Sequence, residues 1–268
     1  GIEEEHAVTF SAGLAAGGLK PFCNIYSSFS QRAFDQIIHD VALQNLPVVL
    51  CLDRGGIVGE DGATHHGCYD MAIYRTIPGA IIAAPMNETE LKNMMYSSML
   101  SADGPYIIRY PRGYGEGTDW QGTEFEEYSV GKGILLKEGE DIAVIAAGPV
   151  ANRVVEAAEM IKEKTGHCPS IYNIRYIKPV DEGMLEEVCR NFSEIVTIED
   201  GCIIGGLYGC VAEYVSRQDR QIRVSPIAIP DRYLSQGTQE ELRRECSLTT
   251  ETIAGVLEEK MKKYQKKD

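Results

Sequence analysis

Short runs of apolar residues alternate along the chain with longer stretches in which apolar positions recur every three or four residues. The runs are typical of strands buried on both faces, and the longer spacing is typical of helices with one buried face. In the first half we expect strands at 21–27, 47–53, 80–85 and 106–110, and helices at 4–16, 29–44 and 87–100. In the second half we expect strands at 141–147, 170–176, 194–199 and 224–229, and helices at 151–165, 181–190, 206–216 and 238–246.

This alternation predicts an α/β protein of two domains, each a mostly parallel sheet flanked by helices. A Gly-rich, acidic stretch that holds the only tryptophan interrupts it. We therefore expect a first domain at 1–115, a linker at 116–130 and a second domain at 131–255. A basic helical tail at 256–268 should present a solvated face.

Composition and charge argue against a disordered, nucleic-acid-binding, membrane-spanning or secreted protein. The chain has 268 residues, of which 44% are hydrophobic and 25% charged, so it should fold rather than remain disordered. Its net charge of −14 opposes general binding to nucleic acid. No apolar run approaches the ~20 residues that span a bilayer, and the acidic start differs from a secretory signal. We expect a cytoplasmic protein that does not bind membranes.

Cysteine and histidine positions predict neither a disulfide framework nor a metal site. The eight cysteines form no C-x-x-C pair, and several lie inside apolar runs, which favours buried, reduced thiols. His65 and His66 are adjacent and the other histidines are isolated, so no metal-ligand spacing occurs. We expect no metal bound by this chain alone.

Two arginines directly follow predicted strands, Arg54 after 47–53 and Arg112 after 106–110. Ligands of open α/β sheets bind outside the carboxyl ends of strands, so both are candidates for contacts to an anion. Spacing alone leaves simpler roles open for other polar residues. Acidic residues at 3–5 suit the start of a helix, Asp61 suits a turn, and His65 suits a structural role.

Longer motifs resemble one family in their order along the chain. The run GIEEEHAVT at 1–9 resembles the pyrimidine-binding domain of thiamine-diphosphate enzymes of the transketolase superfamily. Segments 25–36, 39–47, 53–65 and 109–113 resemble the 1-deoxy-D-xylulose-5-phosphate synthases in particular. In the second half, Glu199-Asp200-Gly201, Gly205-Gly206, Pro230-Asp231 and QGTQEE at 236–241 resemble the C-terminal domain of the same family.

This resemblance implies a site for the pyrimidine end of thiamine diphosphate. Glu4 is expected to hydrogen-bond the pyrimidine ring and favour the tautomer that serves as the base. Phe29 is expected to pack on that ring, and Arg32 to support the cofactor. In the substrate site, Tyr26, Arg54 and Arg112 are expected at a phosphate. Asp61 is expected to orient an arginine or a substrate hydroxyl, and His65 to handle a proton.

The implied reaction condenses pyruvate with glyceraldehyde 3-phosphate and releases CO2. Members of the family hold the diphosphate through Mg²⁺ in an N-terminal domain with a Gly-Asp-Gly motif, which is absent here: Glu60 precedes Asp61-Gly62, and Glu199 precedes Asp200-Gly201. We expect the C-terminal portion of a synthase, inactive alone, with the diphosphate-binding domain in the same chain or a separate subunit. Family analogy implies a homodimer.

Other functions remain open at this point. The chain could be the C-terminal subunit of a split transketolase, the β subunit of a 2-oxoacid dehydrogenase, or a noncatalytic assembly module. Glycines at 201–209 could suggest a nucleotide loop, but they lack G-x-G-x-x-G. Close packing of a helix is therefore favoured for this stretch.

Overall fold

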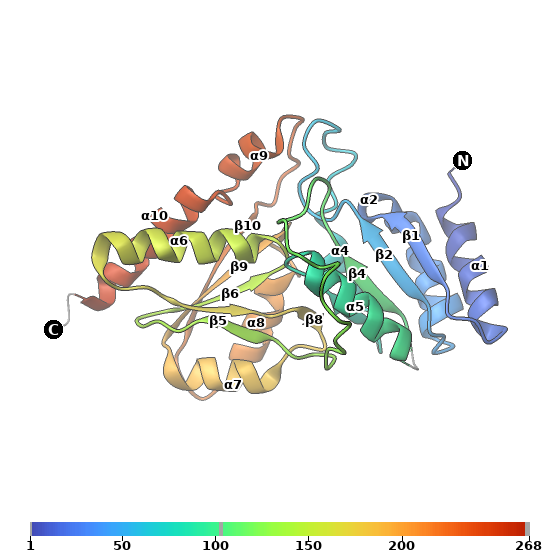
Figure 1. Ribbon diagram of the computed structural model, residues 1–268, viewed down its shortest axis with the longest axis horizontal. Coiled ribbons are helices and arrows are strands. Elements are labelled where there is room, and N and C mark those ends of the chain that lie inside the picture. The colour runs from blue at the N-terminus through green and yellow to red at the C-terminus, as the bar shows by residue number, and fades with distance from the viewer. Residues whose placement is uncertain (1, 102–103, 266–268) are drawn as a thin grey trace.

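The apolar runs of the first half become adjacent parallel strands in the computed structural model, which describes residues 2–101 and 104–265 (Figure 1). The first sheet has the order β1-β2-β4-β3-β8. All neighbouring pairs are parallel except β3 with β8. The strands are β1 (Phe22–Tyr26), β2 (Val49–Asp53), β4 (Tyr106–Arg109), β3 (Ile81–Ala83) and β8 (Tyr176–Lys178).

The second sheet has the order β10-β9-β6-β7-β5. Only β5 runs antiparallel to its neighbour among its described strands. The strands are β10 (Arg223–Ile229), β9 (Glu194–Cys202), β6 (Ala143–Ala147), β7 (Ser170–Asn173) and β5 (Ile134–Lys137). The predicted fold class, two mostly parallel sheets flanked by helices, is confirmed.

Alternating residues of β6 face different layers of helices, because successive side chains of a strand point to opposite faces. Val144 and Ala146 share a core with residues of α6 (Val150–Thr165) and α10 (Thr250–Gln265). Ala143 and Ile145 belong to the core that includes α7 (Glu182–Asn191) and α8 (Leu207–Val215). Figure 1 shows these two pairs of helices on opposite sides of the second sheet.

The first sheet is covered in the same way. Leu50 and Leu52 of β2 pack in one core with Val8 of α1 (Glu4–Ala16). Val49 and Cys51 pack in another core with Met94 of α5 (Glu88–Leu100). Burial of both faces explains why this strand reads as an uninterrupted apolar run.

The helix expected at 29–44 is divided into four short elements. They are α2 (Ser27–Ser30), a 3₁₀ turn η1 (Gln31–Ala33), α3 (Phe34–Gln36) and a π-helix η2 (Ile37–Ala42). Ala33, Ile37 and Val41 are fully buried at a spacing of four residues. The spacing therefore predicted the buried face, whereas the changes of helix type have no apolar signature.

Three short elements did not show in the apolar pattern: α4 (Asp70–Tyr74), β5 and β8. Strand β8 comes from the second half of the chain, yet it completes the first sheet beside β3. Its Tyr176 hydroxyl lies 3.0 Å from the hydroxyl of Tyr106 in β4, and both rings are buried. One core also contains residues of both sheets, including Ile82, Ile107 and Ile145. The two halves are thus joined by a strand and by a common core.

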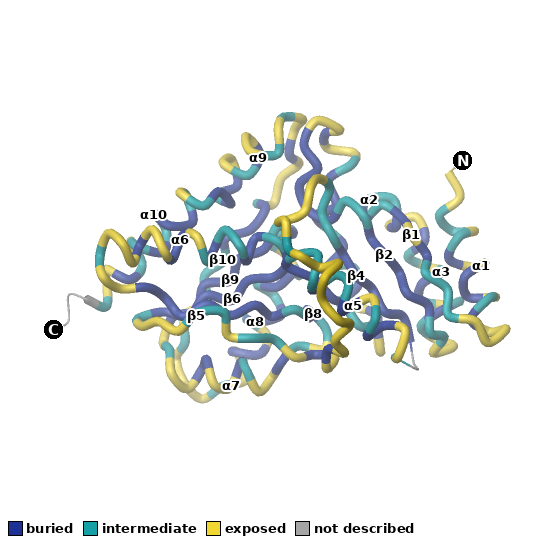
Figure 2. Tube along the Cα trace, viewed as in Figure 1, coloured by how far each residue is buried: buried dark blue, intermediate teal, exposed yellow. Residues whose placement is uncertain are grey.

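Between β4 and β5, residues 110–133 contain no helix or strand and are largely exposed (Figure 2). This stretch lies along α5, where Lys92 Nζ donates to the carbonyl of Trp120 at 3.0 Å and Glu88 accepts from the amide of Gly117 at 2.8 Å. The predicted linker, 116–130, lies within it. The domain boundaries remain a proposal.

The second half ends with α9 (Gln239–Glu245) and α10. Thr238 accepts from the amide of Glu241, whose side chain accepts from the amide of Thr238, so the two residues form a capping box. In the predicted basic tail, Lys260 pairs with buried Glu194 at 2.7 Å. Gly1 and residues 266–268 lie outside the described residues.

All eight cysteines are free, and only Cys202 among them is partly accessible. Within the part of the chain that the structure describes, no helix has the length and apolar character needed to cross a bilayer.

Candidate active site

Glu4 is the first residue of α1, and its side chain is 13% exposed. Its Oε1 lies 3.5 Å from Nη1 of Arg32, whereas its Oε2 is buried without a hydrogen-bond partner. Glu4 also lines a cavity of about 260 Å³ together with Asn24, Tyr26 and Phe29. A buried acceptor with no partner costs free energy in the absence of a ligand, which makes this carboxyl a candidate for contact with a ligand.

Aromatic rings continue from this cavity. The Phe29 ring stacks on Tyr26, with centroids 5.4 Å apart, and meets His65 edge-on at 5.1 Å. The guanidinium of Arg32 lies 5.2 Å from the centroid of the same Phe29 ring. His65 Nδ1 is 2.9 Å from the Thr64 hydroxyl. Phe29 therefore lines the same cavity as Glu4 and also contacts the imidazole of His65.

Charged groups form the other end of the site. The Arg54 guanidinium lies 4.1 Å from the centroid of the Tyr26 ring, and its Nη1 donates to Asp61 Oδ2 at 2.8 Å. Arg112 Nη1 lies 3.5 Å from the same oxygen and donates to the carbonyl of Val58 at 2.8 Å. The structure thus brings together every site residue predicted from the sequence, through a continuous series of contacts.

The sheet explains this convergence. Tyr26 ends β1, Arg54 follows β2, and Arg112 follows β4 by three residues. Strands β1, β2 and β4 are parallel neighbours, so their carboxyl ends meet at one edge of the sheet. Arg54 has a φ of 62°, which turns the chain sharply out of β2.

Glycines close the loop that carries Asp61 and His65. Gly56 and Gly67 exchange backbone hydrogen bonds of 2.7 and 2.9 Å, which join the two ends of the loop. A Cβ at Gly67 would lie 2.2 Å from the carbonyl oxygen of Arg54, so only glycine fits. We call residues 55–67 the glycine loop.

Sequence reasoning missed a buried ionic network beneath the glycine loop. The Arg109 side chain is 2% exposed; its Nε donates to Asp70 at 2.9 Å and its Nη1 donates to Asp200 at 2.8 Å. Ser27 Oγ also donates to Asp70, at 2.9 Å. Burial lowers the pKa of Arg109, but the two carboxylates outweigh it and raise that pKa overall. An arginine inside an apolar strand is the one signal that could have indicated this network, since such a charge needs buried partners.

Glu199, which lies in a sequence motif but was given no role by it, is a second buried ionisable group. Burial raises the pKa of its carboxyl to about 7, although the amides of Leu207 and Tyr208 donate to it. A Cβ at Gly206 would lie 2.1 Å from Glu199 Oε2, and one at Gly205 would lie 3.1 Å from Ala72. The glycines at 205 and 206 therefore allow α8 to pack closely on β9 and α4. This agrees with the sequence analysis, which favoured close helix packing because the stretch lacks G-x-G-x-x-G.

His66, next to the candidate His65, is buried and bonded through both ring nitrogens. The amide of Val58 donates to its Nδ1 at 3.2 Å, and its Nε2 lies 3.1 Å from the carbonyl of Ser235. These partners require the neutral tautomer with hydrogen on Nε2. His66 is thereby unsuited to proton transfer, in contrast to the partly exposed His65 beside it.

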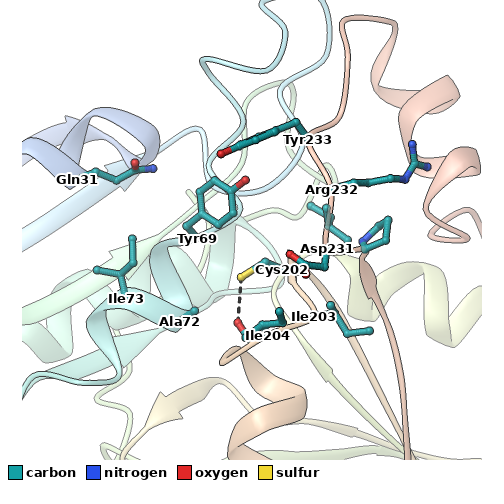
Figure 3. A pocket seen from close by; sticks show the side chains of 12 residues that line it. Gln31, Tyr69, Ala72, Ile73, Cys202, Ile203, Ile204, Asp231, Arg232 and Tyr233 are labelled. Carbon is teal, nitrogen blue, oxygen red and sulfur yellow. Dashed lines mark hydrogen bonds between the residues drawn. The ribbon is translucent and has the colours of Figure 1, made fainter.

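A larger cavity of about 690 Å³ lies elsewhere, between α4 and the chain that follows β9 and β10 (Figure 3). Its walls include Tyr69, Cys202 and Tyr233. Burial raises the pKa of the Cys202 thiol to about 11, and this thiol donates to the carbonyl of Ile204 at 3.1 Å. None of the predicted site residues lines this cavity, and its thiol is poorly suited to act as a nucleophile.

Comparison with known proteins identifies both halves of the chain. Residues 1–116 match the family model for the pyrimidine-binding domain of transketolase, and residues 131–253 match the model for its C-terminal domain. The 1-deoxy-D-xylulose-5-phosphate synthase of Bacteroides thetaiotaomicron is 52% identical over 94% of this chain and 39% of its own length. The enzyme of the same name from Cytophaga hutchinsonii is 49% identical over 95% of this chain and 40% of its own length. The chain thus spans about 40% of the length of these relatives.

Among solved structures, a split-gene transketolase described as an inactive β4 tetramer superposes with a TM-score of 0.85 at 25% identity. The match covers 96% of this chain and 82% of that one. A transketolase from Pichia stipitis, at 20% identity and a TM-score of 0.78, shares the fold.

Proposed function

Because the chain belongs to the transketolase family, as a pyrimidine-binding domain followed by a C-terminal domain, we propose that it is part of a thiamine-diphosphate-dependent 1-deoxy-D-xylulose-5-phosphate synthase. The reaction would condense pyruvate with glyceraldehyde 3-phosphate and release CO2. The high identity to enzymes of that name favours this activity over others of the family.

The unpartnered Oε2 of Glu4 is the observation that carries the proposal. A buried carboxyl beside an aromatic wall fits a heteroaromatic ring that offers a nitrogen to hydrogen-bond and a face to pack on. Glu4 would hold a proton at a pyrimidine nitrogen, Phe29 would support the ring and exclude water, and Arg32 would stay beside Glu4. When bound, thiamine diphosphate supplies a carbon nucleophile that adds to a 2-oxoacid and permits loss of CO2.

Arg54 and Arg112 would bind the phosphate of the aldehyde acceptor. Guanidinium groups offer paired donors that match phosphate oxygens, and both groups already lie against Asp61. Tyr26 would support the Arg54 guanidinium, which lies 4.1 Å from the centroid of its ring. Asp61 would hold the two arginines near each other, because its Oδ2 lies close to both. In this chain, whose net charge is −14, an anionic substrate requires such local positive charge.

His65 would transfer a proton on the substrate. It lies in contact with Phe29 and so adjoins the space between Glu4 and the arginines. Its Thr64 contact orients the ring while one ring nitrogen remains available. Imidazole both donates and accepts a proton near neutral pH, which suits a step in which charge develops on a substrate oxygen.

We infer further that the diphosphate and its Mg²⁺ are held by another domain, in the same polypeptide or in a separate subunit. Among the described residues, no group of three His, Cys, Asp or Glu side chains could hold a metal ion. We also propose a cytoplasmic homodimer. The oligomeric split-gene transketolase supports self-association of chains of this kind.

The direct test supplies this chain with the diphosphate-binding domain of a relative, fused or separate. The assembly should release CO2 from pyruvate and condense the remainder with glyceraldehyde 3-phosphate, and the chain alone should release none. CO2 release by the chain alone at the rate of the assembly would contradict the proposal. Transfer from a ketose phosphate without pyruvate would instead indicate the split transketolase that the structural match also permits.

A further inference from the structure

A segment of the second half contacts the glycine loop directly. Residues 235–239, which precede and begin α9, lie beside residues 57–62 of the loop. Ile57 of the loop is buried in the same core as Leu234 and Leu242, which flank this segment. In Figure 1 the two stretches meet at the end of the molecule where α9 begins.

Gln239 joins two parts of the candidate phosphate site. Its Nε2 donates to the carbonyl of Ile57 at 3.2 Å and to the carbonyl of Arg112 at 3.1 Å. Its Oε1 accepts from Arg243 Nη2 at 3.0 Å. Both polar atoms of this amide therefore have partners: Ile57 in the glycine loop, Arg112 after β4, and Arg243 in α9.

Further contacts hold residues 235–239 against the glycine loop. Buried His66 reaches the carbonyl of Ser235, and a Cβ at Gly59 would lie 3.2 Å from Cγ of Gln239. Gly59 and Gly62 have φ values of 93° and 76°, so glycine is required there both by conformation and by the close approach of the segment. The capping box of Thr238 fixes the first turn that presents Gln239.

We propose that Gln239 is a positioning residue that sets the separation of Arg112 from Asp61 and so determines preference for a phosphorylated aldehyde. Its hydrogen bonds to these two parts go to backbone carbonyls and not to the guanidinium of Arg112. Both donors of one amide are used, so the two parts cannot separate without loss of a hydrogen bond. The substrate named in this inference rests on the proposed function, whereas the contacts of Gln239 do not depend on it.

Two variants separate positioning from folding. Gln239→Glu keeps the shape and the contact with Arg243 but turns acceptors toward two carbonyls, and Gln239→Met keeps the length without any donor. Gln221→Glu is the matched control, because Gln221 is exposed in the loop before β10. Hydrogen exchange of this chain should show faster exchange of amides 56–62 in both Gln239 variants and no change in the control.

In the enzyme assembled with the diphosphate-binding domain, both variants should raise KM for glyceraldehyde 3-phosphate about tenfold. Values of kcat, and KM for unphosphorylated glyceraldehyde, should change less than about twofold. The inference is overturned if hydrogen exchange of amides 56–62 is unchanged in the Gln239 variants. It is also overturned if KM rises equally for the phosphorylated and the unphosphorylated aldehyde. If the unsubstituted assembly turns over neither aldehyde, the proposed function fails. The inference is then tested by binding of inorganic phosphate to this chain: weaker binding to Gln239→Glu than to the unsubstituted chain supports it, and equal binding overturns it.

Discussion

At the scale of single residues, Glu199 is a carboxyl that the fold keeps partly protonated near neutral pH. Burial raises its pKa from 4.5 to about 7. The folded state therefore binds more protons than the unfolded state between about pH 4.5 and pH 7, so the free energy of unfolding falls as pH rises through this range.

Glu199→Gln should remove this pH dependence. Relative to the variant, the unsubstituted chain should lose about 3 kcal/mol of unfolding free energy between pH 4.5 and 7.5. Urea unfolding of both proteins across this range measures the difference, and contributions of other groups cancel. Parallel curves for the two proteins would show that the pKa of Glu199 is the same in the folded and unfolded states.

The residues that could be predicted are those in long motifs. Glu4, Arg54 and His65 come from three separate segments, and only the order of several motifs linked them to one site. Arg109 and Gln239 also lie in quoted motifs, 109–113 and 236–241, but the motifs alone did not indicate what these two side chains contact. Arg109 looks like part of a strand until its partners, Asp70 and Asp200, are placed beside it. Gln239 lies 127 residues from Arg112, whose carbonyl it contacts, so no local pattern reports the pair.

At the scale of elements, α9 depends on its first turn. Thr238 and Glu241 satisfy one another's backbone amides, which would otherwise lack partners at the start of this short helix. Thr238→Ala should lower the free energy of unfolding by about 1 kcal/mol, whereas Thr238→Ser should retain stability because the hydroxyl remains. Chemical denaturation measures both. An equal loss in the two variants would assign the effect to the threonine methyl group.

Strands that lie inside a longer apolar run were predictable from the pattern, and elements outside such a run were not. Strands β2 and β4 are buried on both faces, so their residues are apolar except for Asp53 and Arg109 at their ends. Strand β8 has three residues, and its place beside β3 depends on the packing of two halves that are remote in sequence. The same limit applies to α4, whose five residues are too few to display a helical period.

At the scale of the whole molecule, the two sheets are connected by a strand, an ion pair and shared apolar packing. Strand β8 crosses to the first sheet, and Arg109 of the first half pairs with Asp200 of the second. A core common to both sheets adds apolar contacts between them. The chain should therefore unfold in a single transition rather than in two.

Asp200→Asn tests this coupling. It removes one partner of a buried arginine and should cost about 3 kcal/mol. Calorimetry should show one transition before and after the substitution, shifted as a whole to lower temperature. Two resolved transitions, of which only one moves, would mean that the sheets unfold independently.

The account as a whole depends on the Glu4 carboxyl. In the enzyme assembled with the diphosphate-binding domain, Glu4→Gln should lower the rate of CO2 release from pyruvate at least about a hundredfold, because the proton held at the pyrimidine nitrogen is lost. Glu3→Gln and Glu5→Gln, at adjacent positions of the same helix start, should stay within about threefold, and all three variants should unfold at the same temperature. Full activity of Glu4→Gln, or an equal loss on substitution of Glu3, would contradict the proposed site.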